Sequence, residues 1–248
     1  MQIFKILLFN PLYNCLVGII DLVPGGDVGI AIIILTILVR LVILPLYIKS
    51  IRTQMKMKEI EPEMAQIKVK YEKDKMEQSR QTMELYKKYK INPFSTFLVL
   101  LIQLPVILSL FYVFKSSLVI DKEIIYSFIS IPNSINSHFL GFIDISANKN
   151  YFLAVLTGLT QYIQMQFALP KPAKKDPNNK TQSFKDDLAR SMDIQMRYVM
   201  PLMIIFISIG LPAAISIYWV TSNIIATLFE VFIRRNVRNK KEPAILTN

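Results

Sequence analysis

Long apolar runs alternate with charged segments along this chain. The runs cover residues 28–48, 94–114, 151–169 and 199–233, and each is close to or above the roughly 20 residues that cross about 30 Å of hydrocarbon as a helix. The last run is too long for one span, and Gly210-Leu211-Pro212 interrupts it, which predicts two helices joined by a tight turn. The pattern therefore predicts an all-α membrane protein with five transmembrane helices, at residues 28–48, 93–114, 151–169, 198–211 and 212–233.

The segment before the first span, residues 1–27, is predicted to hold an interfacial helix and a turn. Residues 2–22 form an amphipathic stretch that ends at Pro24-Gly25-Gly26, so we expect the helix to lie in the outer membrane interface. A cleaved signal peptide is not expected, because the basic flank is weak and no small-residue cleavage site follows. The residues before Cys15 are large, which argues against lipidation, and a single cysteine excludes an internal disulfide.

Composition and charge place the chain in a membrane with a defined orientation. The 248 residues are 52% hydrophobic and carry a net charge of +11, which excludes an ordinary soluble domain. Residues 49–92 hold twelve Lys and Arg, residues 170–198 hold seven and residues 234–241 hold five, whereas residues 1–29 and 115–150 together hold four. The positive-inside rule then predicts an outer N-terminus, an outer loop at residues 115–150, a cytoplasmic loop at 170–197 and a basic cytoplasmic tail at 234–248. Attraction to anionic lipid or to ribosomal RNA is a secondary interpretation of the charge.

Arg40 lies near the middle of the first predicted span. The nearest flanking charge, Lys49, is nine residues or roughly 13 Å away along the helix axis, so snorkelling barely reaches the interface. A charged arginine at a helix centre costs at least about 2.5 kcal/mol. No acidic residue lies at the same depth in any predicted span, since Glu230 is near the end of the fifth. The sequence therefore predicts a hydrated cavity lined by neutral polar groups around Arg40.

Neutral polar residues occur at helical spacing on several spans and could line such a cavity. Thr36 precedes Arg40 by one turn, Gln103 lies in the second span, and Ser222 lies in the fifth. The third span carries a polar stripe at Thr157, Gln161 and Gln164. For each residue the plainer interpretation is a hydrogen bond between packed helices. Together with an arginine that has no acidic partner, the stripe favours a hydrophilic groove that accepts a polar or acidic stretch of another molecule.

Residues 49–92 are predicted to form a cytoplasmic antiparallel helical hairpin, resembling a short coiled coil. Apolar residues keep a helical spacing across Pro62, which predicts a kink there, and polar residues place the tip near residues 73–78. Five of the eleven methionines fall in this segment, and methionine suits varied apolar partners. The alternative, that these side chains only hold the two arms together, stays open. The candidate partner-binding residues are Met64, Ile67, Tyr71, Met76 and Met83.

Nothing in the sequence predicts catalysis. It contains no P-loop and no metal-ligand cluster, and its one histidine, His138, lies in the predicted outer loop. We expect no enzyme activity, no metal site and no cofactor.

Several motifs, in order along nearly the whole chain, resemble those of the YidC family of membrane protein insertases. They are residues 36–45 with the central arginine, Glu61-Pro62-Glu63, residues 85–93, residues 100–105, Met200-Pro201-Leu202-Met203, Leu211-Pro212-Ala213 and residues 218–223. No single motif carries the match. The short chain lacks the large extracytoplasmic domain of Gram-negative members and the lipoprotein signal of many Gram-positive ones, and Ala214 stands where members often have Gly.

The resemblance implies a function as an insertase and chaperone of the bacterial cytoplasmic membrane. Five helices would enclose a hydrophilic groove, open to the cytoplasm and to lipid, in which Arg40 attracts acidic residues of a nascent protein. Gln164 and Trp219 resemble the family's groove residues, and the helical hairpin resembles its substrate-receiving element. The implied partners are nascent membrane proteins and lipids, with the Sec translocon and the ribosome as further candidates, and the short tail predicts weak ribosome binding.

Two other functions remain open from the sequence. A small-anion transporter or channel would use Arg40 as an anion site, but the sequence repeats expected between the halves of such a protein are not evident. A structural assembly factor would bind finished subunits only.

We expect a monomer without specific nucleic-acid recognition.

Overall fold

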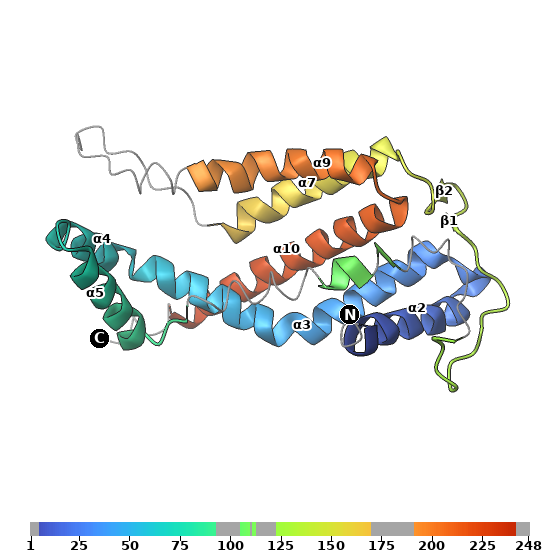
Figure 1. The fold of residues 1–248 in the computed structure, drawn as a ribbon, viewed down its shortest axis with the longest axis horizontal. Helices are drawn as coiled ribbons and strands as arrows, with labels where there is room; N and C mark the ends of the chain where they lie inside the picture. Colours follow the sequence, from blue (N-terminus) through green and yellow to red (C-terminus); the bar gives the residue numbers. More distant parts are fainter. Residues whose placement is uncertain (1–4, 93–104, 110, 113–122, 170–190, 242–248) are drawn as a thin grey trace. The chain divides into compact units, whose positions relative to one another are not determined.

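The structure is a computed structural model that describes residues 5–92, 105–109, 111–112, 123–169 and 191–241, with side chains up to residue 237 (Figure 1). It is mostly helical and divides into two compact units. The first comprises Met1–Val42 and Leu104–Phe229, and the second comprises Ile43–Gln103 and Glu230–Asn248. Most of the predicted second span, including Gln103, lies outside the described residues.

Two long helices, α3 (Val28–Glu59) and α10 (Ala213–Lys241), run through both units. The remaining elements of the first unit are η1 (Lys5–Phe9), α2 (Asn10–Leu22), η2 (Pro24–Gly26), β1 (His138–Phe139), β2 (Ile143–Asp144), α7 (Tyr151–Ala168), η3 (Gln195–Val199) and α9 (Met200–Ile209). The second unit also contains α4 (Glu61–Lys70) and α5 (Lys75–Lys88).

The core of the first unit lies where α2, the start of α3 and the start of α10 meet. Leu16 of α2, Ile32 of α3 and Ile215 of α10 are each at most 1% exposed and belong to one apolar cluster. A helix is thus present in the segment where an interfacial helix was predicted, and one of its faces packs against α3 and α10.

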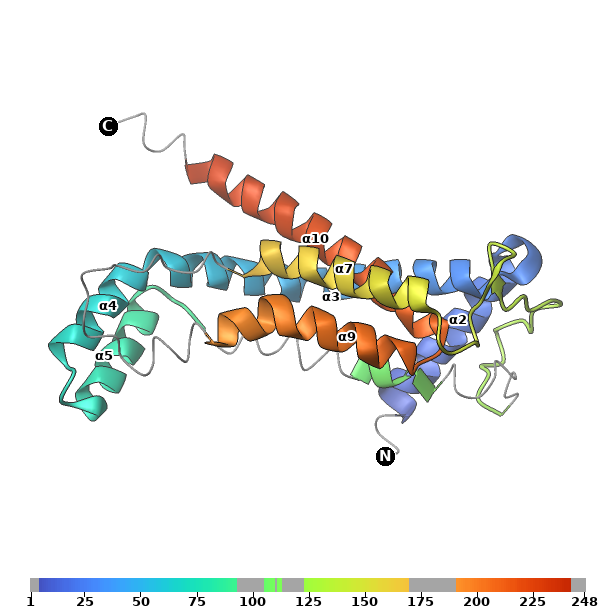
Figure 2. The same cartoon turned by 90° about the horizontal axis from the view of Figure 1, so that it is seen from above.

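In the first unit α7 and α9 lie side by side, as both views show (Figures 1 and 2). Gly158 of α7 allows this close approach. A Cβ atom at that position would lie 2.2 Å from Cγ1 of Ile205 and 3.0 Å from the carbonyl oxygen of Pro201. Ridges formed by larger side chains would hold the two helices further apart.

In the second unit a buried acid joins the C-terminal halves of α3 and α10. Glu230, only 2% exposed, accepts hydrogen bonds from the Tyr47 hydroxyl at 3.1 Å and from Nε of Arg234 at 2.6 Å. Arg234 Nη2 also donates to Gln54 at 3.5 Å. A buried carboxylate needs such partners because desolvation of an unpaired charge is costly.

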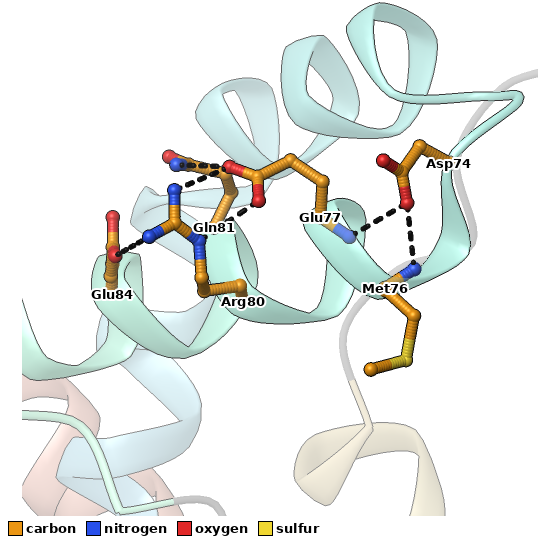
Figure 3. A network of polar contacts seen from close by, with 6 residues as sticks. All are labelled: Asp74, Met76, Glu77, Arg80, Gln81 and Glu84. Atoms are coloured by element: carbon orange, nitrogen blue, oxygen red, sulfur yellow. Dashed lines mark hydrogen bonds and ion pairs between the residues drawn. The ribbon is translucent and has the colours of Figure 1, made fainter.

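Helices α4 and α5 pack together around Ile60, Leu85 and Ile91. Helix α3 ends at Glu59 and α4 begins at Glu61, with Pro62 in the first turn of α4, where its missing N–H costs no hydrogen bond. The connection between α4 and α5 occupies residues 71–74, slightly before the predicted tip. The shift arises because Asp74 accepts hydrogen bonds from the backbone N–H groups of Met76 and Glu77 and so starts α5 at Lys75 (Figure 3).

Within the described residues, four helical segments are long and apolar enough to cross a membrane. They are Lys5–Leu22, Val28–Glu59, Ser191–Ile209 and Ala213–Val237. The predicted third span corresponds to α7, an 18-residue helix that is not among them. Gln161, Gln164 and Gln166 lower its hydropathy. Polar residues in an otherwise apolar helix are typical of helix contacts or of a hydrated face.

Candidate functional site

The guanidinium of Arg40 contacts the fifth predicted span through one hydroxyl. Arg40 Nε donates to Oγ of Ser222 at 2.9 Å, and Nη2 donates to the same oxygen. Both residues lie in the first unit, where Ser222 is buried and Arg40 is half-buried. Arg40 is twelve residues, or about 18 Å, from the start of α3.

The described ion pairs do not include Arg40. A serine hydroxyl is neutral, so it orients the guanidinium without cancelling its charge. Arginine carries five N–H donors, and one shared oxygen cannot satisfy all of them. Within the part of the chain that is described, Arg40 therefore retains both its charge and donor capacity for a further acceptor.

The other predicted groove residues fall into two groups. Thr36 and Thr157 are buried, and each hydroxyl donates to a carbonyl of its own helix, at 2.6 Å to Ile32 and at 2.8 Å to Leu153. Both hydroxyls thus donate within their own helix, and not to a packed neighbouring helix as the plainer interpretation expected. Gln161 donates to Gln164 on α7 at 3.3 Å, which brings these two amides together. Trp219 is half-buried against the apolar cluster of the first unit.

Two polar contacts between helices of the first unit were missed by the sequence reasoning. Asn223 of α10 donates to the hydroxyl of Thr160 on α7 at 3.3 Å. Arg197, 4% exposed in the π-helical turn η3, donates to Asp193 at 2.8 Å and to Gln166 of α7 at 3.1 Å. The four-residue spacing of Asp193 and Arg197 was a visible signal, since such pairs face each other on a helix.

The candidate residues of the helical hairpin also fall into two groups, packed and exposed. Met64 and Ile67 pack against the apolar cluster between α4 and α5, as the alternative interpretation has it. Met76 and Met83 of α5 are 84% and 50% exposed. Tyr71, half-buried, ends α4. Within the predicted set, Met76 and Met83 are the residues that can meet an apolar partner.

A family model described as "60Kd inner membrane protein" matches residues 19–241. The membrane protein insertase YidC of Clostridium tetani (strain Massachusetts / E88) is 37% identical over 202 residues, which cover 82% of this chain and 79% of the relative. The chain belongs to the YidC family of membrane protein insertases. The YidC of Fusobacterium nucleatum subsp. nucleatum is 32% identical over 214 residues, 85% of this chain and 87% of the relative.

A solved YidC structure agrees with this assignment. The chain matches the crystal structure of an active YidC insertase with its first transmembrane domain resolved, with a TM-score of 0.52 and 27% identity. The match covers 92% of this chain and 45% of the solved chain. The predicted family and the mostly helical membrane fold are confirmed.

Proposed function

We propose that this protein is a membrane protein insertase and chaperone that receives hydrophobic nascent proteins in a hydrated groove around Arg40 and releases them sideways into lipid. The observation that carries the proposal is the pairing of Arg40 with Ser222 in a chain of the YidC family. The pairing fixes a charged group within an apolar helix while leaving it able to bind an acidic residue.

The mechanism needs no covalent step. Moving a polar tail across hydrocarbon is opposed mainly by desolvation, and a hydrated cavity that reaches partway shortens the dry distance. Arg40 would attract acidic groups of the tail, and Gln161, Gln164, Thr36, Thr157, Trp219 and Ser222, with Gln103 of the second span, would line the route. The attraction must be weak, because the substrate has to leave.

The proposed topology has five spans, an outer N-terminus and a cytoplasmic C-terminus. The basic segments at residues 49–92 and 234–241 support this orientation. The helical hairpin of α4 and α5 would then lie in the cytoplasm, beside the ribosome or the Sec translocon, and the protein would act as a monomer that serves one substrate at a time.

Insertion by the purified protein tests the proposal. Proteoliposomes with this protein alone should protect a single-span substrate with a short acidic tail from added protease, and empty liposomes should not. They should show no increase in small-anion flux over empty liposomes. Anion flux without insertion would instead favour a transporter or channel.

We expect the exposed methionines of α5 to contribute to substrate capture. Replacing Met76 and Met83 with glutamine should weaken crosslinking of nascent chains to the hairpin about tenfold, because the loss of about 1.4 kcal/mol of apolar contact corresponds to that factor. Met64→Gln serves as the control, since Met64 packs between the arms and should lower thermal stability instead. Equal crosslinking by the double variant and the parent would contradict the role of these side chains.

A second prediction concerns the pH response of the helical hairpin. The Tyr89 hydroxyl donates to Glu63 and lowers the pKa of that carboxyl, and Lys88 at 3.4 Å adds to the effect. Because the pKa is lowered in the folded state, its contribution to stability is present above the unfolded value of about 4.3 and is lost as the pH falls through the folded pKa. Tyr89→Phe should raise the Glu63 pKa towards its ordinary value in a carboxyl-carbon NMR titration, whereas Tyr86→Phe should not. An unchanged titration in Tyr89→Phe would refute this assignment.

A further inference from the structure

A single stretch of the outer loop is fastened to the N-terminal ends of three helices. The backbone of Asn136 accepts from Val28, the first residue of α3, at 3.1 Å and donates to Gly26 at 2.9 Å. Ala213 and Ala214, the first residues of α10, donate to Ala147 and Ile145. The side chain of Asn150 accepts from Leu153 at 3.0 Å and caps α7. Residues 134–150 therefore lie at the end of the first unit where all three helices begin.

The small β-hairpin within this stretch, β1 and β2, is anchored to the start of α3. The backbone N–H of Leu140 donates to Oδ2 of Asp27 at 2.9 Å, and Oδ1 of the same carboxylate accepts from Ile30. The Phe139 ring lies so close to Gly29 of α3 that a Cβ atom there would be 2.3 Å from it. Ile145, just after β2, is completely buried. The base of the β-hairpin is part of the folded core.

The tip of the β-hairpin, Leu140-Gly141-Phe142, is apolar and exposed. Leu140 is 56% exposed and Phe142 is 73% exposed, and no Asp, Glu, Lys or Arg occurs from His138 to Ile143. Leu140 has a φ of 52°, a left-handed conformation that Gly or Asn adopts at lower cost. Phe128, earlier in the same loop, is 78% exposed. Two large apolar side chains on an anchored tip are unfavourable in water.

We propose that Leu140 and Phe142 insert into the lipid of the outer leaflet, at the boundary between headgroups and acyl chains. The N–H of Leu140 donates to Asp27, the residue before α3, so the tip is held close to the level at which α3 begins. A helix that spans the bilayer begins near the headgroup layer, where amphipathic elements bury their apolar side chains about 5–10 Å deep. The inference takes the outer side of the membrane from the proposed span topology. The position of the tip at the N-terminal helix ends comes from the hydrogen bonds.

Tryptophan fluorescence in liposomes tests this proposal directly. The chain has one native tryptophan, Trp219, whose emission can be subtracted using the parent protein. Phe142→Trp, in the full-length protein reconstituted in phosphatidylcholine vesicles, should emit at shorter wavelength than Asn133→Trp, a variant at an exposed polar position of the same loop. Lipids brominated on their acyl chains should quench the Phe142→Trp signal at least twofold more than the Asn133→Trp signal.

Two outcomes would overturn the proposal. Equal emission and equal quenching of the two variants would place the tip in water. Protection of the Phe142→Trp signal from aqueous acrylamide without quenching by bromolipid would mean that protein covers the tip. Leu140→Trp gives an independent second position if Phe142→Trp does not fold. The readout needs no insertase activity, so insertion measured in the same vesicles fails or succeeds separately.

Discussion

Arg40→Glu is expected to reduce insertion of single-span substrates with acidic tails at least tenfold. The substitution replaces attraction by repulsion between the groove and the tail. A single charge pair at about 4 Å is worth about 4 kcal/mol at an effective dielectric constant of 20, well above the roughly 1.4 kcal/mol that a tenfold change requires. Protease protection of the substrate tail in proteoliposomes measures the effect, and full insertion by Arg40→Glu would eliminate the electrostatic role.

Three further variants separate charge from hydration at this site. Arg40→Lys keeps the charge but cannot donate twice to Ser222 in the same geometry, and Arg40→Gln keeps polarity without charge. If charge is required, only Arg40→Lys retains substantial insertion of acidic tails. If the side chain only keeps the cavity hydrated, Arg40→Lys and Arg40→Gln both retain insertion of acidic tails. Arg52→Glu, the same change of charge on an exposed residue of α3, should leave insertion nearly unchanged.

Gly26→Ala is expected to lower the free energy of unfolding more than other single changes in the turn between α2 and α3. Gly26 has a φ of 65°, where an L side chain costs roughly 1–2 kcal/mol. Its Cβ atom would also lie 2.1 Å from the carbonyl oxygen of Ser134, and such overpacking adds about 1–3 kcal/mol. Because Ser134 precedes the segment that joins the starts of α3 and α10, we expect residues 134–150 to detach. Thermal unfolding in mild detergent, followed by size-exclusion chromatography, measures the loss.

Gly25→Ala is a matched control for this prediction. Gly25 has a similar φ of 74°, but nothing lies within 4 Å of the Cβ position. Gly25→Ala should therefore lower the free energy of unfolding only by the cost of the left-handed conformation. Equal stability losses for the two variants would mean that the contact with Ser134 contributes nothing.

Much of the helical fold could be predicted because apolar runs and turn residues are local signals. The run that starts at Val28 predicted a helix, and α3 begins there. Its end could not be predicted from hydropathy, since a helix does not stop at the membrane boundary when the following residues, through Glu59, still favour helix. The β1–β2 pair was missed because two-residue strands are too short to show an alternating pattern, and their pairing depends on contacts with Asp27 and Gly29.

The candidate site was only partly accessible from sequence. The cost of a charge in an apolar helix singled out Arg40, and the count of acids argued against an ion pair. The polar residue that meets Arg40 is determined by the packing of α3 against α10. Arg40 and Ser222 are 182 positions apart in the chain, and a single sequence carries no signal for a contact at that separation. The bonds of Thr36 and Thr157 within their own helices were not predicted, because a threonine that faces a groove and one that bonds its own helix have the same spacing.

Photocrosslinking from Gln164 of α7 to ribosome-bound nascent chains tests whether a substrate groove lies at Arg40. A crosslinker at Val155, about 180° around the same helix and exposed, is the matched control. We expect adducts from Gln164 with chains still being synthesised, fewer adducts in Arg40→Glu, and few from Val155. Adducts only with completed, released proteins, or stronger adducts from Val155 than from Gln164, would contradict an insertase groove at Arg40.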